Sequence, residues 1–204
     1  MSLTKINPPR KRNPIQQNAG EMKKSVKITY FVHGTTTDNE KEISSGWADV
    51  ELSDLGVRQS KDLGKLLEDE YFDAVYCSDL KRAVDSAQHM WRDKFPIVKD
   101  RRLRECNYGD YNGRPSHIVE PLQQKSITEP MPNGESYENV KDRIANFLEH
   151  LIREHDGQSV AIVGHKAPQL ALDVLLKGKT WEEAFSEDWR NTKNWQPGWG
   201  YIVK

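Results

Sequence analysis

Apolar runs alternate with amphipathic segments along most of the chain. Apolar residues at steps of three and four predict helices, most clearly over residues 80–91, 140–152 and 168–176. Ser53 and Ser136 precede two of the amphipathic segments and are good N-caps. Strands alternating with helices predict an α/β fold with a mostly parallel sheet. The apolar runs typical of buried strands occupy residues 27–33, 73–78, 95–100, 159–165 and 198–204.

Two parts of the chain do not follow this alternation. Residues 1–25 are rich in Pro, Asn and Gln and carry three consecutive basic residues, which predicts a disordered basic N-terminal tail. Glycines and prolines interrupt residues 104–134, where we expect irregular structure. A chain of 204 residues is too short for two ordinary domains, so residues 26–204 are expected to form one domain.

Composition narrows the classes of function. The 30 basic and 31 acidic residues almost cancel, which argues against a general nucleic-acid or membrane-surface binder. No apolar run is long enough to span a membrane. The two cysteines, Cys77 and Cys106, have neither metal-ligand spacing nor the pattern of a disulfide framework. These features favour a cytoplasmic protein that acts on a small molecule.

Polar side chains follow the predicted strands, where a parallel sheet presents its ligand site. His33 and His165 each end an apolar run beside a glycine, which lets the backbone approach a ligand closely. Arg82 falls in the first turn of a helix, where a cation is disfavoured unless it holds an anion. With the amide of Asn39, these residues predict an anion pocket. Phosphate is the natural occupant, because arginine binds it bidentately.

The order of these motifs resembles the histidine phosphatase superfamily, the phosphoglycerate mutase-like proteins. The family opens with Arg-His-Gly, followed at fixed spacing by Thr and Asn. Its later signatures resemble "SDLKRAVDSA", "LRECNYGDYNG", "PNGES" and "VAIVGH" of this chain. The opening motif is matched by His33, Gly34, Thr36 and Asn39.

This resemblance implies a three-layer α/β/α sandwich and a mechanism that needs neither metal nor cofactor. His33 would attack phosphorus and form a phosphohistidine. Glu105 would protonate the leaving oxygen and then take a proton from water. Charge on the transferred oxygens would be stabilised by Arg82, Asn39 and His165, with Gly34 and Thr36 in the phosphate-binding loop.

The chain departs from the family pattern at two positions. Val32 stands where the family has its leading arginine, and Lys166-Ala167 follow the second histidine, where small residues are usual. Losing one preorganised donor to an oxyanion costs about 10²–10³ in rate. One hypothesis is that Lys166 restores the missing positive charge in the pocket. The alternative is that Lys166 points to solvent as an ordinary helix-start residue.

Three functions are therefore considered. The first is a metal-independent phosphomonoesterase working through phospho-His33. The second is a phospho-ligand-binding protein without activity, disarmed by Val32, and the third is a phosphoglycerate mutase-like transferase. Retention of Glu105 favours catalysis, because a binding protein has little need of a proton-transfer group. The segment after Glu105 is expected to cover the pocket and to offer Tyr108, Tyr111 and Arg114 to a substrate. The tryptophans at 181, 189, 195 and 199 are expected to pack the C-terminal elements onto the sheet.

Overall fold

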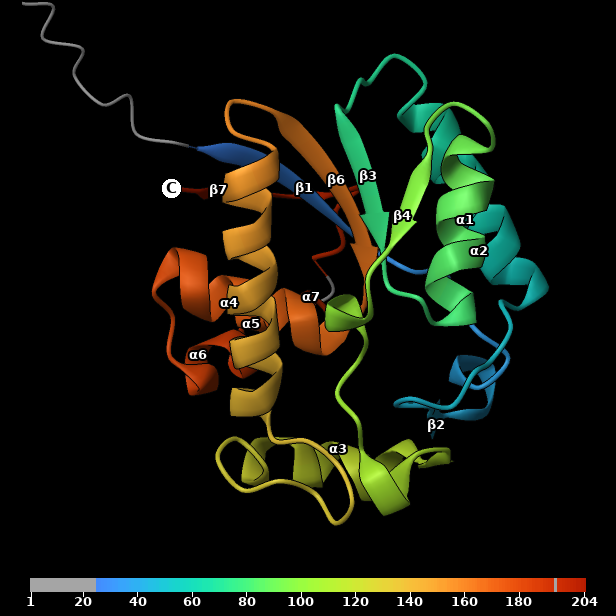
Figure 1. Ribbon diagram of the computed structural model, residues 1–204. Coiled ribbons are helices and arrows are strands. Elements are labelled where there is room, and N and C mark those ends of the chain that lie inside the picture. The colour runs from blue at the N-terminus through green and yellow to red at the C-terminus, as the bar shows by residue number, and fades with distance from the viewer. Residues whose placement is uncertain (1–24, 193) are drawn as a thin grey trace, which may run out of the picture.

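The computed structural model of the chain describes residues 25–192 and 194–204. Within this range five strands form one sheet in the order β4-β3-β6-β1-β7 (Figure 1). Neighbouring strands from β4 to β1 are parallel, whereas β7 pairs antiparallel with β1 at the edge. The mostly parallel sheet that the sequence predicts is confirmed. Its strands are β1 (Val26–Val32), β3 (Ala74–Cys77), β4 (Ile97–Lys99), β6 (Ser159–Gly164) and β7 (Trp199–Val203).

Helices cover both faces of the sheet and give it the expected three layers (Figure 1). Neighbouring side chains on β1 point to opposite faces, so Tyr30 belongs to one core cluster and Phe31 to the other. Phe31 packs edge-on against Trp91, with ring centroids 5.5 Å apart. One layer holds α1 (Asp54–Leu66) and α2 (Lys81–Trp91); the other holds α4 (Tyr137–Glu154), α5 (Lys166–Lys177) and α6 (Trp181–Ser186).

Local capping fixes the starts of the two helices whose N-caps are predicted. The Ser53 hydroxyl accepts the backbone N–H of Gly56 at the start of α1. Ser136 and Asn139 form a capping box at the start of α4, each side chain accepting the other residue's backbone N–H. Both N-cap predictions are confirmed.

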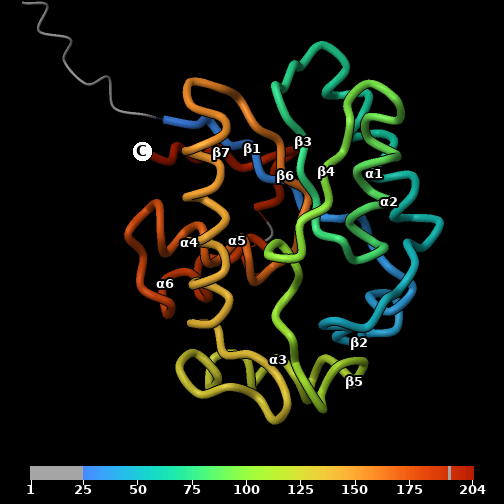
Figure 2. Tube along the Cα trace, in the orientation of Figure 1, coloured from blue at the N-terminus to red at the C-terminus, as the bar shows by residue number. Residues whose placement is uncertain are grey.

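The segment over residues 104–134 is more regular than predicted. It contains the helix α3 (Ser116–Lys125) and the strand β5 (Arg114–Pro115), which pairs with β2 (Ile43–Ser44). Pro121 lies inside α3 and conceals its helical pattern in the sequence. Figure 2 shows β2 and β5 meeting beside α3, at the foot of the molecule. Three short 3₁₀ segments complete the loops: η1 (Asn39–Lys41), η2 (Arg101–Leu103) and η3 (Gly109–Tyr111).

The two ends of the described chain lie close to each other. Figure 2 shows the C-terminal strand β7 beside the start of β1, consistent with their pairing. The predicted tail, residues 1–25, lies outside the described residues except for Ser25, whose backbone N–H donates to Asp156. After α5 the chain forms two short helices, α6 and α7 (Trp189–Thr192). None of the described helices is long and apolar enough to cross a membrane.

Candidate active site

An open cavity of about 1120 Å³ lies at the carboxyl ends of the parallel strands. The sheet edge, the β1–α1 loop and the foot formed by β2 and α3 all contribute to its wall. The structure therefore brings together side chains that are separated by up to 133 positions in the chain. The predicted site residues on its wall are His33, Gly34, Thr36, Asn39, Arg82, Glu105 and Lys166.

His33 follows directly after β1 and is held in one tautomer. Its Nδ1 lies 2.8 Å from the carbonyl oxygen of Gly34, an acceptor, so Nδ1 must carry the proton. Nε2 is then left with its lone pair. Desolvation in the pocket, reinforced by the charges of Arg82 and Arg190, lowers the pKa of His33 to about 3. The ring is therefore neutral at pH 7, which is the form that a nucleophile requires.

His165 lies beside His33, with the two ring centroids 5.0 Å apart. It is fully buried, and neither of its ring nitrogens has a hydrogen-bond partner among the described residues. Burial lowers its pKa well below the usual range, followed by the charges of Arg82 and His33. Buried polar groups are normally paired, so the unpaired ring next to His33 is unusual. His165 is not among the residues that line the cavity, and its contact with phosphate stays a prediction.

Arg82, in the first turn of α2, brings a positive charge to the cavity wall. It is 2% exposed, and its guanidinium donates to the carbonyl oxygens of Ala48 (3.0 Å) and Gly46 (2.7 Å). Among the described residues no carboxylate forms an ion pair with it. Burial lowers the pKa of Arg82, an effect that nearby Glu105 partly opposes. A buried cation without a counter-charge is costly, so an anion in the cavity would be bound favourably.

The loop from Gly34 to Asn39 is shaped by its own hydrogen bonds. The Gly34 N–H donates to the Ser86 hydroxyl, and the Thr36 N–H donates to Asn39 Oδ1. The Asn39 N–H donates in return to Thr36 Oγ1. All three backbone donors are therefore already engaged, although the residues line the cavity. Their contact with phosphate, like that of the Asn39 amide, stays a prediction.

Close packing on α1 sets the position of this loop. A Cβ at Gly56 would lie 1.9 Å from the carbonyl oxygen of Thr35, and one at Gly34 would lie 2.5 Å from the carbonyl oxygen of Gly56. Only glycines allow the two backbones to approach so closely. Gln59 of α1 also accepts the Thr35 N–H, at 2.9 Å. The start of α1 thus holds the chain directly after His33.

Glu105 connects the cavity to the start of α5. Its Oε1 accepts the backbone N–H groups of Cys106 (2.8 Å) and Ala167 (3.0 Å), and its Oε2 accepts that of Lys166 at 3.2 Å. The carboxylate therefore sits on the positive end of the helix that follows His165. Two of the three donors use Oε1, so Oε2 is the oxygen more available for proton transfer.

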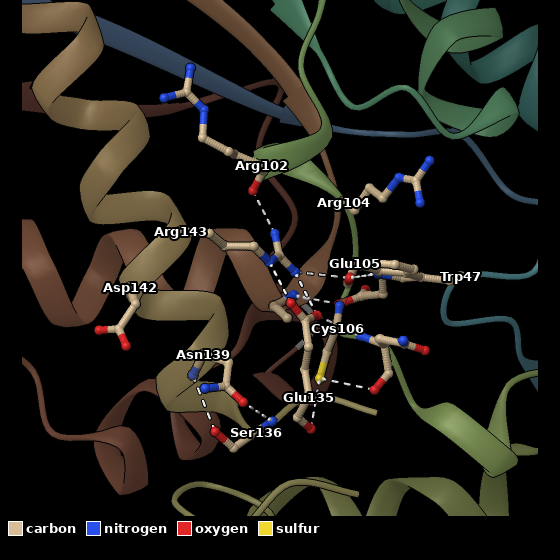
Figure 3. Close-up of polar contacts among 12 residues, drawn as sticks. Trp47, Arg102, Arg104, Glu105, Cys106, Glu135, Ser136, Asn139, Asp142 and Arg143 are labelled. Atoms are coloured by element: carbon tan, nitrogen blue, oxygen red, sulfur yellow. Dashed lines mark hydrogen bonds and ion pairs between the residues drawn. The ribbon is translucent and has the colours of Figure 1, made fainter. Parts of the chain in front are cut away.

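A second network behind Glu105 fixes its backbone (Figure 3). The Glu105 carbonyl oxygen accepts hydrogen bonds from Trp47 Nε1 (2.6 Å) and Arg143 Nη2 (2.9 Å). Arg143 also pairs with Glu135, whose Oε2 accepts the N–H of Asn107. The segment that carries Glu105 is thereby attached to α4. Cys106 is buried in this region, and burial raises the pKa of its thiol, consistent with a structural side chain.

Comparison with known proteins places this arrangement in a family. The family model of the histidine phosphatase superfamily (branch 1) matches residues 30–196, a range that contains every predicted site residue. The chain belongs to the histidine phosphatase superfamily.

Relatives of this superfamily member include mutases and phosphatases. A 2,3-bisphosphoglycerate-dependent phosphoglycerate mutase of Cytophaga hutchinsonii is 34% identical, covering 71% of this chain and 74% of the relative. Phosphoserine phosphatase 1 of Hydrogenobacter thermophilus is 30% identical, covering 75% of this chain and 77% of the relative. The solved structure of Bacillus stearothermophilus YhfR has a TM-score of 0.74 at 25% identity, covering 88% of this chain and 91% of that one. The phosphoglycerate mutase-like fold is thereby confirmed.

The side chain of Lys166 points toward other residues of the protein and not toward solvent. Its Nζ donates to Gln123 Oε1 (3.1 Å), lies 3.5 Å from Asp188 Oδ2 and lies 5.7 Å from the centroid of the Phe185 ring. The side chain lines the cavity, so the alternative that it points to solvent is not what the structure shows. Its role as a phosphate ligand stays a prediction.

The sequence-based interpretation misses the C-terminal wall of the cavity. Trp189, Trp195 and Trp199 line it. Trp189 stacks on Trp199 of β7, with ring centroids 5.6 Å apart, so these two also pack the C-terminal elements together as predicted, whereas Trp195 is exposed. Trp181 is buried and does pack as predicted. The available signal was the density of aromatic and cationic residues in "DWRNTKNWQPGW", which also brings Asp188 and Arg190 to the site. Of the three predicted substrate contacts in the segment after Glu105, Tyr108 lines the cavity, whereas Tyr111 and Arg114 do not.

Proposed function

We propose that the chain is a metal-independent phosphomonoesterase that works through a phosphohistidine on His33. The observation that carries the proposal is the state of His33. It is neutral, its Nδ1 proton is held by Gly34, and it lines a cavity with the buried, uncompensated cation Arg82. This combination of a nucleophile and an anion site suits phosphoryl transfer. Phosphatases among the relatives support the same reaction class.

In the first step, the lone pair of His33 Nε2 attacks phosphorus and the bond from phosphorus to the ester oxygen breaks. Arg82 and the ring of His165 stabilise the charge on the three transferred oxygens. The leaving oxygen takes a proton from Glu105, which must enter this step protonated on Oε2. Keeping Nδ1 protonated lets the hydrogen bond to Gly34 support the positive charge that develops on the ring.

In the second step, water attacks the phosphohistidine and the nitrogen–phosphorus bond breaks. Glu105, now a carboxylate, takes the proton from that water. Its backbone donors from Cys106, Ala167 and Lys166 stabilise the charged form that exists between the steps. Phosphate leaves, His33 returns to its neutral state and Glu105 is again protonated.

The experiment is hydrolysis of p-nitrophenyl phosphate in the presence of a chelator, with alkaline quenching to trap a base-stable, acid-labile phosphoprotein. The wild type is compared with His33→Ala and with the matched control His117→Ala, a surface histidine on α3. We expect turnover and a trapped phosphoprotein in the wild type and the control, and loss of both in His33→Ala. Turnover that survives in His33→Ala, or that disappears with the chelator, would contradict the proposal.

The same assay separates the two alternative functions. A binding protein would retain inorganic phosphate without forming the phosphoprotein. A mutase would form it but pass the phosphoryl group to a hydroxyl acceptor such as a phosphoglycerate faster than to water. The mutases among the relatives make this acceptor test worthwhile.

A further inference from the structure

Two cations face the cavity from the C-terminal side and share one carboxylate. The Asp188 side chain is only 1% exposed. Its Oδ1 accepts Arg190 Nη1 (2.8 Å) and the backbone N–H of Arg190 (3.1 Å), while Oδ2 lies 3.5 Å from Lys166 Nζ. One negative charge therefore faces two positive ones. The excess positive charge lies on the wall of the cavity that contains His33.

Arg190 has the more available head group of these two cations. Its guanidinium lies 4.5 Å from the centroid of the Trp189 ring, which supports its plane. Nη1 is used by Asp188, but Nε and Nη2 have no hydrogen-bond partner within residues 25–192 and 194–204. Lys166, by contrast, already donates to Gln123. A planar guanidinium with free N–H groups matches the geometry of phosphate better than an ammonium does.

The residue directly before the nucleophile brings no such charge. Val32, the last residue of β1, lines the cavity next to His33 with an aliphatic side chain. Arg82 and Arg190 both line the cavity, and both charges act on the His33 ring, where they oppose its protonation. Arg190 is thus close enough to His33 for its field to matter there.

We propose that Arg190, positioned by the buried carboxylate of Asp188, binds the phosphoryl group at His33 together with Arg82. Asp188 is a positioning residue: it fixes Nη1 and leaves the other guanidinium N–H groups for the ligand. In this arrangement Arg190 supplies the second cation that Val32 does not. The inference rests on the proposed phosphoryl site at His33.

Inorganic phosphate binding, measured by calorimetry and by ³¹P NMR, tests the inference without requiring turnover. The variants are Arg190→Ala and Arg190→Gln, with Arg58→Ala on the exposed face of α1 as the matched control. We expect both Arg190 variants to bind phosphate at least tenfold more weakly, and the control to match the wild type. Where turnover exists, kcat/KM falls by about 10²–10³. Arg190→Gln retains a donor for Asp188, so it serves for comparison if Arg190→Ala unfolds.

The second part of the experiment moves the positive charge from position 190 to position 32. Val32→Arg in the Arg190→Ala background places a guanidinium directly before the nucleophile, at a position that lines the cavity, and should recover at least tenfold in phosphate affinity. Phosphate affinity within twofold of wild type in both Arg190 variants would overturn the inference, as would a loss found only in Lys166→Ala. If neither the wild type nor the variants hydrolyse a phosphate ester, but the Arg190 variants bind inorganic phosphate more weakly than the wild type, the inference stands and the proposed hydrolysis fails.

Discussion

The hydroxyl of Tyr30 forms two hydrogen bonds with the backbone of His165. It donates to the His165 carbonyl oxygen at 2.8 Å and accepts the His165 N–H at 2.7 Å. Tyr30 is fully buried on β1, and the neighbouring Gly164 leaves the space that its hydroxyl occupies, since a Cβ there would lie 2.2 Å from it. The strand that precedes His33 thus fixes the second histidine as well.

Tyr30→Phe tests this coupling. Removing the hydroxyl leaves the buried N–H and carbonyl of His165 unpaired, which should cost about 1–3 kcal/mol of unfolding free energy and lower kcat/KM. Tyr201→Phe is the matched control, because its hydroxyl bonds Asp173, away from the cavity. Urea unfolding and phosphatase assays on both variants are the measurement. We expect the control to lose stability but keep its activity; equal activity in the two variants would show that His165 does not depend on Tyr30.

The protonation of His33 gives a prediction in pH. Desolvation, Arg82 and Arg190 lower its pKa to about 3 in the folded chain, against 6.5 when unfolded. Below pH 6.5 the His33 ring therefore binds a proton in the unfolded state but not in the folded state. The His33 contribution makes the folded state less stable as pH falls from about 6.5 toward 3, and is constant above that window.

Two measurements check this pH behaviour in the ligand-free protein. NMR of the His33 ring should show a neutral imidazole, with the proton on Nδ1, from pH 8 to about pH 5. The unfolding free energy should fall less steeply with acid in His33→Gln than in the wild type, because the variant lacks that titration. A His33 transition near pH 6.5, or identical slopes in the two proteins, would contradict the assignment.

The contact between Gly56 and Thr35 predicts an unusual cost for a helix residue. Alanine normally stabilises a helix by about 1 kcal/mol relative to glycine. At Gly56, however, the new Cβ would lie 1.9 Å from the Thr35 carbonyl oxygen, so the loop after His33 must move. We expect Gly56→Ala to reduce both melting temperature and kcat/KM. Gly200→Ala on β7 is the control, because its Cβ meets no atom within 4 Å; an active, stable Gly56→Ala would disprove the claim.

The parts of the site that sequence predicts are those encoded in local patterns. His33 and His165 end apolar runs and Arg82 begins a helix, so the rule for parallel sheets brings them to one edge. Asp188 and Arg190 follow no strand, and they reach the cavity only because the chain turns back after α6. The path of the chain after α6 depends on tertiary packing and leaves no periodic pattern in the sequence. Sequence reasoning likewise predicts that Trp189 packs against the C-terminal elements but does not show that it also lines the cavity, since packing and a cavity wall use the same kind of side chain.

The last prediction concerns the proton that Glu105 donates to the leaving group. If Glu105 donates the proton to the ester oxygen, Glu105→Gln should slow hydrolysis of alkyl phosphates, whose leaving group needs that proton, by about 10²–10⁴. The effect on p-nitrophenyl phosphate should be smaller in the first step, because nitrophenolate leaves without help. Burst kinetics separate this step from hydrolysis of the phosphohistidine, which also needs Glu105.

Gln at position 105 keeps an oxygen for the N–H groups of Cys106 and Ala167, but its amide would face the N–H of Lys166. Glu105→Asp, which retains the acid but shortens its reach, distinguishes lost proton transfer from a disturbed start of α5. We expect the ratio of aryl to alkyl rates to rise sharply in Glu105→Gln and little in Glu105→Asp. An equal slowing of both substrates in Glu105→Gln would show that the carboxylate acts only as a cap on α5, and that the leaving oxygen obtains its proton elsewhere.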